Sequence, residues 1–573
     1  MSVVLLSACA ALVEMPSSDA AYVIHSPILI RHDIADGDSG ITGGTGTELD
    51  PYIIEGWQIE HFDENCIDIQ DSNKHYLIRN VYVRPSPDYQ YHAQYGIHIE
   101  FSSNVTVENC LVENNEGSGI MVYGSRNIRI VNNELSNNLL YFGNCEGVSA
   151  EGNRLYSSPV AMYGSKSVNL ASNAITNSGS IVVDGYCLED FSTHDIADTN
   201  TIDGQPVHYY KNLSSLIIDQ SMDGGEVIIA NCSGVRVSDI NLAEMRGFTL
   251  AYAEDVAVSN VQMYNSQGMQ FRNTTGLEIS NCSYSETGAI VLSGARDVSI
   301  FGCLMDGEAN GIELHGSTNV SIVACNVTSG HTYGVMCYWS TDSTVQSCTF
   351  GNCYDRAVFL HNCAGMAFYH NNMGSNSIWD TSEGTDNAWD NGYPAGGNYW
   401  ANFKGYDNCS GPGQDIDGSD GISDRMYWYD SYPLMEPYAY QHPRAAFTIA
   451  SVDNSTKTYS VNASGCWDPA DTVSSLEVRW DWSGDGEWDT PWSISKTAEH
   501  HYSEPGNYTV FLEVRNSQGL SSITFKDVVV NGIPWTTYLL YAIMAVILMV
   551  ALTISFLLLR RSKRPPEDKV PQQ

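Results

Sequence analysis

The chain is poor in charge, and most of its charge is of one sign. Charged residues are only 16% of the 573 residues, and 27 lysines and arginines stand against 67 aspartates and glutamates, for a formal net charge of −40. Nucleic-acid binding needs a basic surface, so we expect no nucleic-acid partner. An acidic surface favours solvation or the binding of cations.

Helical periodicity and zinc-type cysteine spacing are also missing. No helical pattern of ten or more residues fits between the apolar segments of 96–372, and this excludes a βαβ fold, whose crossovers need one. The chain has 15 cysteines but no C-x-x-C pair, so the spacing of a structural zinc site is absent.

The sequence has instead a short repeat with a period of about 20 to 23 residues, roughly half the length of a propeller blade. No copy can bury its apolar residues alone, so neighbouring copies must stack. Apolar residues alternate within a copy, which is typical of strands with one buried side. The sequence therefore predicts an all-β protein built on a right-handed parallel β-helix, a pectate-lyase-like solenoid with one repeat per coil. The clearest copies are NVTVENC (104–110), NIRIVNN (127–133), DVSIFGC (297–303) and NVSIVAC (319–325).

This repeat resembles those of the NosD-like and the carbohydrate-binding and sugar-hydrolase (CASH-type) β-helix families. The segment NTIDGQPVHYY (200–210) matches a characteristic stretch of the family, and 387–438 resembles the end of NosD-like domains. The Gly-rich segment 40–57 resembles the opening of archaeal surface proteins of this type. The resemblance implies a β-helix with an N-terminal cap over 22–386 and a cap rich in Trp, Asp and Gly over 387–443.

Residues 444–532 are predicted to form a separate small β domain. The segments WDWSGDGEWD (480–489) and HYSEPGNYTVFLEVRN (501–516) resemble the PKD-domain pattern, which is an immunoglobulin-like β-sandwich. PKD-like modules usually serve as spacers or adhesion units on surface proteins. The resemblance therefore implies such a role for this domain.

Two apolar segments bracket the chain. Residues 2–13 are typical of the apolar core of a signal peptide, predicted over 1–21. The uncharged run 539–559 is long enough to cross a bilayer and predicts one transmembrane helix over 536–559. Basic residues follow at once, so we expect the tail 560–573 in the cytoplasm and the large N-terminal part outside the cell.

Asn-x-Ser/Thr sequons agree with an extracellular location. Many fall where the repeat needs Asn at a turn, so only some need carry sugar. The candidate glycosylation sites are Asn104, Asn212, Asn273, Asn454, Asn462 and Asn507.

Alignment of the repeats explains several cysteines as small interior residues. In five copies a cysteine takes the position that holds Asn133, Asn153, Asn173 or Asn371 in other coils. Coils stack about 4.8 Å apart, and disulfides tolerate Cα separations of about 4.4 to 6.8 Å, so oxidised pairs and free thiols both stay open. These cysteines are Cys110, Cys282, Cys303, Cys325 and Cys348.

Two acidic loops are candidate calcium sites. Carboxylate oxygens around glycines suit Ca²⁺, although neither loop has the full EF-hand spacing. A hydrogen-bonded Asx turn is the alternative for the first loop. The candidate ligands are Asp415, Asp417, Asp420 and Asp424 in the first loop, and Asp481, Ser483, Asp485 and Asp489 in the second.

The outward side of the coils carries a predicted column of aromatic and ionisable side chains. Such a row suits stacking against sugar rings, and a solvated β-face is the alternative. The NosD name is tied to copper delivery, but His315 and His361 lie two coils apart, about 9 to 10 Å, so copper is disfavoured. The candidate ligand-binding residues are Glu100, Tyr123, Tyr163, His315, Tyr338 and His361.

Together these features predict a single-pass cell-membrane protein whose extracellular β-helix binds polysaccharide or envelope glycans. A polysaccharide lyase or glycoside hydrolase is the first alternative, and a structural or adhesion component of the envelope is the second. No motif fixes a catalytic pair of residues, so an enzymatic activity is left open and disfavoured.

Overall fold

The computed structural model describes residues 22–530, with short gaps, and residues 549–550. The chain divides into two compact units, Met1–Tyr438 and Ala439–Gln573. The gaps are 37–39, 62–64, 86–94, 114–116, 178, 220–224, 244–246, 265, 267, 287, 308–309, 328–331, 352, 375–376, 381–385, 440–442, 454–455, 469–470 and 518.

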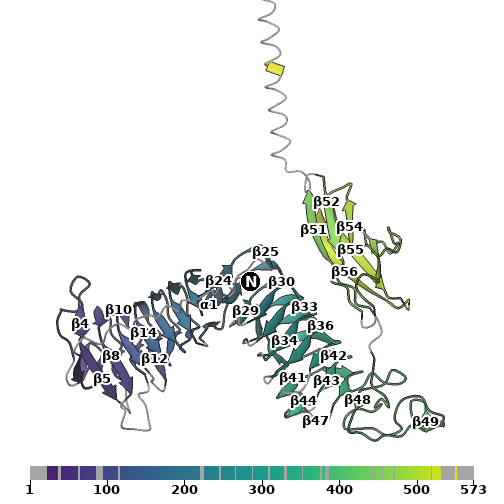
Figure 1. The fold of residues 1–573 in the computed structure, drawn as a ribbon, viewed down its shortest axis with the longest axis horizontal. Helices are drawn as coiled ribbons and strands as arrows, with labels where there is room; N and C mark the ends of the chain where they lie inside the picture. Colours follow the sequence, from purple (N-terminus) through teal and green to yellow (C-terminus); the bar gives the residue numbers. More distant parts are fainter. Residues whose placement is uncertain are drawn as a thin grey trace, which may run out of the picture. The chain divides into compact units, whose positions relative to one another are not determined.

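The first unit is a parallel β-helix made of two stacks of coils (Figure 1). We call residues 22–202 the first stack and 205–400 the second stack. Short strands follow one another around each coil, and each strand pairs in parallel with its equivalent in the next coil, as Val105 pairs with Ile128. The predicted solenoid, with one repeat per coil, is confirmed.

Three sheets form the sides of the first stack. Sheet 1 contains β1 (Val23–His25), β5 (Trp57–His61), β8 (Tyr82–Pro85), β11 (Leu111–Glu113), β14 (Glu134–Ser136), β17 (Arg154–Tyr156), β20 (Ala174–Thr176) and β23 (Thr201–Ile202). Sheet 2 contains β2 (Ile28–Arg31), β6 (Ile67–Gln70), β9 (Ile97–Glu100), β12 (Ser118–Tyr123), β15 (Leu139–Gly143), β18 (Val160–Tyr163) and β21 (Ile181–Asp184), and β3 (Ile34–Asp36) joins β2 antiparallel. Sheet 3 contains β4 (Tyr52–Glu55), β7 (Tyr76–Arg79), β10 (Ser103–Glu108), β13 (Arg126–Val131), β16 (Ser149–Glu151), β19 (Asn169–Ala171) and β22 (Asp195–Ile196).

The second stack is built in the same way. Sheet 4 contains β24 (Gln205–Lys211), β26 (Glu226–Ala230), β29 (Gly247–Ala251), β32 (Met269–Arg272), β35 (Ile290–Ser293), β38 (Ile312–His315), β41 (Tyr333–Tyr338), β44 (Arg356–His361) and β47 (Ser377–Asp380). Sheet 5 contains β25 (Ser214–Ile218), β27 (Ser233–Ser238), β30 (Glu254–Ser259), β33 (Thr275–Ser280), β36 (Arg296–Phe301), β39 (Thr318–Val323), β42 (Thr344–Gln346) and β45 (Ala367–Tyr369). Sheet 6 contains β28 (Asn241–Ala243), β31 (Gln262–Tyr264), β34 (Ser283–Ser285), β37 (Leu304–Asp306), β40 (Asn326–Val327), β43 (Thr349–Phe350), β46 (Asn372–Met373) and β48 (Tyr399–Trp400).

The core of each stack follows from the alternation of apolar residues along the strands. In β10, Val105 and Val107 are fully buried, whereas the intervening Thr106 and Glu108 face outward. Successive side chains of a strand point to opposite faces, so the inward residues of successive coils form continuous apolar columns. Each stack has its own cluster of buried apolar residues, and the cluster of the first stack also includes Val207, Ile228, Ala230 and Ala251 of the second.

The two stacks meet at α1 (Glu189–Ser192) and at the antiparallel pair β23–β24, where the parallel pattern is interrupted. Glu226 in β26 is buried, and its carboxylate accepts a hydrogen bond of 2.7 Å from the Ile181 N–H in β21. The first stack thus makes a direct polar contact with the second through an ionisable side chain in the interior. Burial raises the pKa of Glu226 to about 8.

The segment after the last coil packs aromatic rings against the core of the second stack. The Trp389 ring stacks on Phe368 at a centroid distance of 4.6 Å, and both rings are buried. The buried Asp430 accepts hydrogen bonds from the Asn398 N–H and the Trp400 indole N–H. The same segment contains the short antiparallel pair β49 (Cys409–Ser410) and β50 (Ile416–Asp417).

The second unit contains a sandwich of two small antiparallel sheets around its own apolar core, as predicted from its PKD-like motifs. In β55 (Gly506–Arg515) the alternate residues Val510, Leu512 and Val514 are fully buried. One sheet contains β51 (Thr448–Asp453), β52 (Thr458–Asn462) and β54 (Thr497–His501), and the other contains β53 (Glu477–Asp481), β55 (Gly506–Arg515) and β56 (Ser521–Val530).

The two predicted membrane-related segments are not covered by these observations. The signal peptide at 1–21 lies outside the described residues, and so does the transmembrane segment 536–559 except for residues 549–550. Within the part of the chain that the structure describes, no helix has the length and apolar character needed to cross a membrane.

Candidate functional site

Each strand of sheet 2 from β2 to β18 is followed directly by a turn residue with positive φ. Gly, Asn and Asp adopt this left-handed conformation most readily, whereas a bulky residue there is an outlier. Phe101 is such an outlier, with φ of 46° and a side chain that is 56% exposed. In the first stack these turn residues are His32, Asp71, Phe101, Gly124, Asn144 and Gly164.

A row of buried serines follows this turn position in three successive coils. The Ser72 N–H donates to Ser102 Oγ at 3.0 Å, and the Ser102 N–H donates to Ser125 Oγ at 2.9 Å. The hydroxyls of Ser102 and Ser125 therefore each satisfy a backbone donor of the neighbouring coil, which ties the turns together. This row gives the turn region a rigid polar floor.

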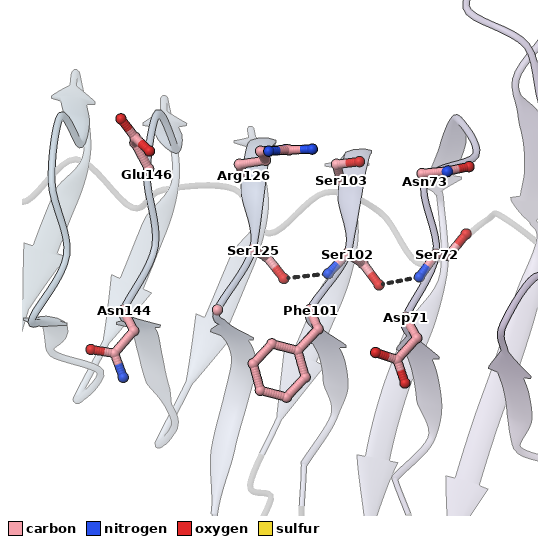
Figure 2. A pocket seen from close by; sticks show the side chains of 11 residues that line it. Asp71, Ser72, Asn73, Phe101, Ser102, Ser103, Ser125, Arg126, Asn144 and Glu146 are labelled. Carbon is pink, nitrogen blue, oxygen red and sulfur yellow. Dashed lines mark hydrogen bonds between the residues drawn. The ribbon is translucent and has the colours of Figure 1, made fainter.

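The serine row lies at the bottom of a groove of about 480 Å³, and an adjoining hollow of about 650 Å³ extends it past Asn104 and Gly147. Figure 2 shows the serines between two rims, with Asp71, Phe101 and Asn144 on one side and Asn73, Arg126 and Glu146 on the other. The complete lining is Asp71, Ser72, Asn73, Phe101, Ser102, Ser103, Gly124, Ser125, Arg126, Asn144 and Glu146.

The Phe101 ring lies against Gly124 of the next coil. A Cβ atom at Gly124 would lie 2.5 Å from the ring, so any other residue there would force the ring to shift. The Tyr123 ring meets Phe101 edge-on at 5.7 Å, and its hydroxyl accepts a hydrogen bond of 2.9 Å from Asn144 Nδ2. Phe101 and Tyr123 thus form a fixed aromatic corner at the rim of the groove.

The groove carries charges of both signs. Arg126 and Glu146 are exposed and occupy paired positions in neighbouring coils, and Asp71 lies on the opposite rim. Amide, hydroxyl, carboxylate and guanidinium groups beside an exposed ring can hydrogen-bond sugar hydroxyls while the ring packs on the apolar face of the sugar.

Three of the predicted ligand-binding residues form a row next to this groove. Glu100, Tyr123 and Tyr163 lie on the outward side of sheet 2, with Glu100 paired to Tyr123 and Gly143 between Tyr123 and Tyr163. A hydrogen bond with Tyr186 raises the pKa of Tyr163 to about 12, and the two rings meet edge-on at 5.1 Å.

The other three predicted residues form a second row on sheet 4. His315 pairs with Tyr338, and Tyr338 pairs with His361, so the two histidines lie two coils apart, as the sequence indicates. The structure divides the predicted column between two sheets, because sheet 2 ends at β21 and the chain reverses at β23–β24. An ion pair of 3.0 Å between Arg272 and Asp184 connects the outward sides of the two sheets.

Sequence reasoning missed Phe101, Asn144, Arg126 and Glu146 as groove residues. Phe101 had a usable signal, because an aromatic residue replaces the Gly, Asn or Asp that most coils have at the turn. Asn144, Arg126 and Glu146 had no such signal in the sequence, because their proximity depends on how consecutive coils align.

The acidic loops use many of their carboxylates to hold backbone N–H groups. Asp424 accepts from the Asn408 and Cys409 N–H groups, each at 3.0 Å. Asp481 accepts from the N–H groups of Ser483, Gly484 and Gly486. No group of three or more His, Cys, Asp or Glu side chains among the described residues could hold a metal ion. Calcium binding at Asp415, Asp417, Asp420, Asp424, Asp481, Ser483, Asp485 and Asp489 stays a prediction.

The predicted glycosylation sites differ in their surroundings. Asn104 Nδ2 donates to the Asn73 carbonyl at 3.1 Å, and Asn212 Oδ1 accepts from Asn231 Nδ2 at 2.7 Å. Asn462 Oδ1 accepts the Ser464 N–H, and Asn507 is exposed. Asn273 has a positive φ of 48°, and Asn454 lies outside the described residues.

Comparison with protein families gives three matches along the chain. Residues 26–193 match the family model of the right handed beta helix region, 198–405 match that of the periplasmic copper-binding protein (NosD), and 441–530 match that of the PKD domain. The chain is a right-handed β-helix protein with a NosD-type segment and a PKD domain. The groove at Phe101 lies in the β-helix region, and the row from His315 to His361 lies in the NosD-type segment.

No curated protein matches this β-helix protein. Similar solved structures include the A-module of the mannuronan C-5 epimerase AlgE6 of Azotobacter vinelandii, with 10% identity over 64% of this chain and 88% of that chain and a TM-score of 0.23. Another is the tailspike receptor binding domain of siphovirus 9NA, with 9% identity over 82% and 95% of the two chains and a TM-score of 0.23. At these scores neither likeness carries an argument about function.

Proposed function

We propose that the β-helix binds glycans, with the Phe101 groove as its binding site. The observation that carries the proposal is the exposed aromatic ring in a left-handed turn position, beside a polar groove. Holding a bulky residue in this conformation costs on the order of 1 kcal/mol or more, and such strain clusters at functional sites. An exposed ring also gains little from burial, so packing does not offset this cost.

The groove matches the chemistry of a carbohydrate chain. Sugars present an apolar face of C–H groups and a rim of hydroxyls. The Phe101 and Tyr123 rings supply the apolar contact, and Asn144, Arg126 and Glu146 supply donors and acceptors on the two rims. The groove crosses several coils, so its long direction suits an extended polymer better than a single small molecule.

Glycan-array binding of the full chain, compared with that of variants, tests the proposal. Phe101→Gly places at this turn the residue that the next coil has at Gly124, so we expect glycan affinity to fall at least tenfold while the fold is kept. Tyr123→Ala should weaken glycan binding less than Phe101→Gly, because it removes the ring that meets Phe101 edge-on but keeps the Phe101 ring itself. Tyr156→Ala, which changes an exposed ring on sheet 1, is the matched control and should bind like the unmodified protein.

Two outcomes would contradict this proposal, the first for the site and the second for the binding role. If Phe101→Gly binds glycans as well as the unmodified chain, the groove is not the site. If the protein releases reducing ends or unsaturated sugars from a polysaccharide, the function is enzymatic, and turnover assays on the same glycans detect this directly.

We also propose that this binding takes place at the cell surface. The apolar segment 536–559 would anchor the chain in the cell membrane, and the PKD domain would serve as the spacer between anchor and β-helix. The support is the sequence: an uncharged run of bilayer length followed by basic residues. Removal of residues 536–573 should release the protein from the membrane fraction, and retention there would contradict the anchor.

A further inference from the structure

The second stack has the same left-handed turn position, and one of its residues stands out. Trp339 occupies this position with φ of 50°, and its side chain is 61% exposed. The other occupants are Asn, Gly and one tyrosine. They are Asn212, Asn231, Tyr252, Asn273, Gly294, Gly316 and Asn362.

Packing accounts for the tyrosine but not for the tryptophan. The Tyr252 ring packs against Phe191 at 5.6 Å, and its hydroxyl donates to the Tyr186 carbonyl at 3.3 Å, where the two stacks meet. Trp339 instead leaves most of its indole in solvent. Packing therefore does not offset the free energy needed to hold Trp339 in a left-handed conformation, and the same is true of Phe101.

Trp339 lies beside a floor of rings on sheet 4. The indole lies 5.6 Å from the Tyr338 ring and 5.9 Å from the His361 ring. Tyr338 also stacks on His315 at 5.6 Å, with an interplanar angle of 5°. Because these residues come from three consecutive coils with fixed register, the floor is rigid.

Polar groups line one side of this floor. His315 Nε2 and Glu313 Oε2 are 3.0 Å apart, and Glu313 Oε1 accepts a hydrogen bond of 2.8 Å from Asn310. The hydrogen bond from His315 holds the pKa of Glu313 below its usual range, so this carboxylate is ionised at neutral pH. Arg356 lies in β44, two strands from Glu313, and is in an ion pair of 2.7 Å with Asp355. Glu313, Asp355 and Arg356 together carry a net negative charge.

We infer that Trp339, Tyr338 and His361 form a second sugar-binding site, separate from the Phe101 groove, for a neutral hexopyranose unit of a glycan. The indole and the phenol offer a platform for the apolar face of the ring. Glu313 borders this platform through its 3.0 Å contact with His315. The negative charge of Glu313 disfavours a uronate or sulfated sugar. This inference rests on the proposed glycan-binding function and adds a second site and a ligand class.

The experiment uses the full chain and replaces Trp339 by the residue found at the same turn of the next coil. Trp339→Asn removes the indole and suits the left-handed backbone, as Asn362 does. We expect its Tm to stay equal to or rise above that of the unmodified protein. The effect on binding is measured in the Phe101→Gly background, where only the second site is present. There, the Phe101→Gly/Trp339→Asn double variant should bind neutral gluco- and manno-oligosaccharides at least tenfold more weakly than Phe101→Gly alone.

Tryptophan fluorescence gives a direct readout of the site. Neutral oligosaccharides should change the emission of the Phe101→Gly protein, and this change should disappear in the Phe101→Gly/Trp339→Asn double variant. Tyr264→Ala, an exposed ring on sheet 6 of the same stack, is the matched control and should leave the change intact.

The outcomes separate the two proposals. If Phe101→Gly alone abolishes binding, there is no second site, and the groove stands. If the Phe101→Gly/Trp339→Asn double variant binds as tightly as the unmodified chain, both sites are wrong. If the second site binds oligouronates more tightly than neutral sugars, the ligand class is wrong. A Tm of Trp339→Asn that falls by several degrees would show that the indole supports the fold, and this would overturn the inference.

Discussion

The middle coils of the two stacks use different residues at the same interior turn, although Cys110 also takes this place in the first stack and Asn371 in the second. In the first stack, Asn153 accepts hydrogen bonds from the N–H and the side-chain amide of Asn133 and donates to the Ile130 carbonyl and to Asn173. In the middle of the second stack, cysteines take this place in four consecutive coils. They are Cys282, Cys303, Cys325 and Cys348, and all are buried.

The difference shows two ways of stabilising the interior turn of a coil. The asparagine ladder satisfies backbone groups of neighbouring coils with strong amide hydrogen bonds. The cysteines make long bonds to backbone carbonyls, such as the 3.5 Å bond from Cys303 to Phe301, and weak thiol–thiol contacts with the cysteines of neighbouring coils. Burial raises the pKa of Cys325 well above its usual range, so this thiol stays protonated. The first stack should therefore depend on polar ladder bonds and the second on apolar packing.

Breaking the asparagine ladder should give the largest effect. Asn153→Ala leaves the Asn133 N–H and the Ile130 carbonyl buried without their partner. Each such group costs about 1 to 3 kcal/mol, so we expect the free energy of unfolding to fall by about 3 to 5 kcal/mol. Denaturant unfolding measures this, with Ser149→Ala on the outward side of β16 as the control. A loss below about 1 kcal/mol would show that the ladder is replaceable.

The contact between the stacks should respond to pH. The pKa of Glu226 is about 8 in the folded chain and lies near 4.5 in the unfolded chain, so between these pH values the folded state keeps a proton that the unfolded state loses. The stability contributed by neutral Glu226 is present below pH 4.5 and is lost as the pH rises through 8.

Glu226→Gln isolates this effect. Its amide oxygen can still accept the Ile181 N–H, but it carries no charge at any pH. At pH 9 the variant should be more stable than the unmodified chain by on the order of 3 kcal/mol, and the difference should shrink towards pH 5. Urea unfolding at several pH values checks this, with the exposed Glu254→Gln as the control. Parallel pH profiles for the two proteins would contradict it.

Changing the cysteine row should have the smallest effect. Cys303→Ala removes one small buried side chain and no strong hydrogen bond, so we expect a loss of about 1 kcal/mol. The comparison with Asn153→Ala is the informative result, because the two positions are equivalent in their coils. A loss as large as that of Asn153→Ala would mean that the thiols hold the coils together, for instance as disulfides, and mass spectrometry without reductant would detect these.

The sequence by itself determined the local architecture. The repeat length, the alternation of Ile97, Ile99, Val105 and Val107, and the shared interior position of Asn and Cys all predict the coils correctly. The PKD-like sandwich followed in the same way. These features depend on residues within one coil or one strand. The buried positions recur with the period of the repeat, so the sequence alone shows the pattern.

Only the tertiary structure decided where the coils stop matching and where a ligand would fit. The sequence shows that the repeat is interrupted at 194–210, but not that the predicted single column becomes two rows, which follows from the reversal of the chain at β23 and β24. One rim of the groove forms where the Phe101 ring lies against Gly124 of the next coil. Such contacts join residues about one coil apart, and their geometry depends on the register between coils, which is set by the packing of the whole stack.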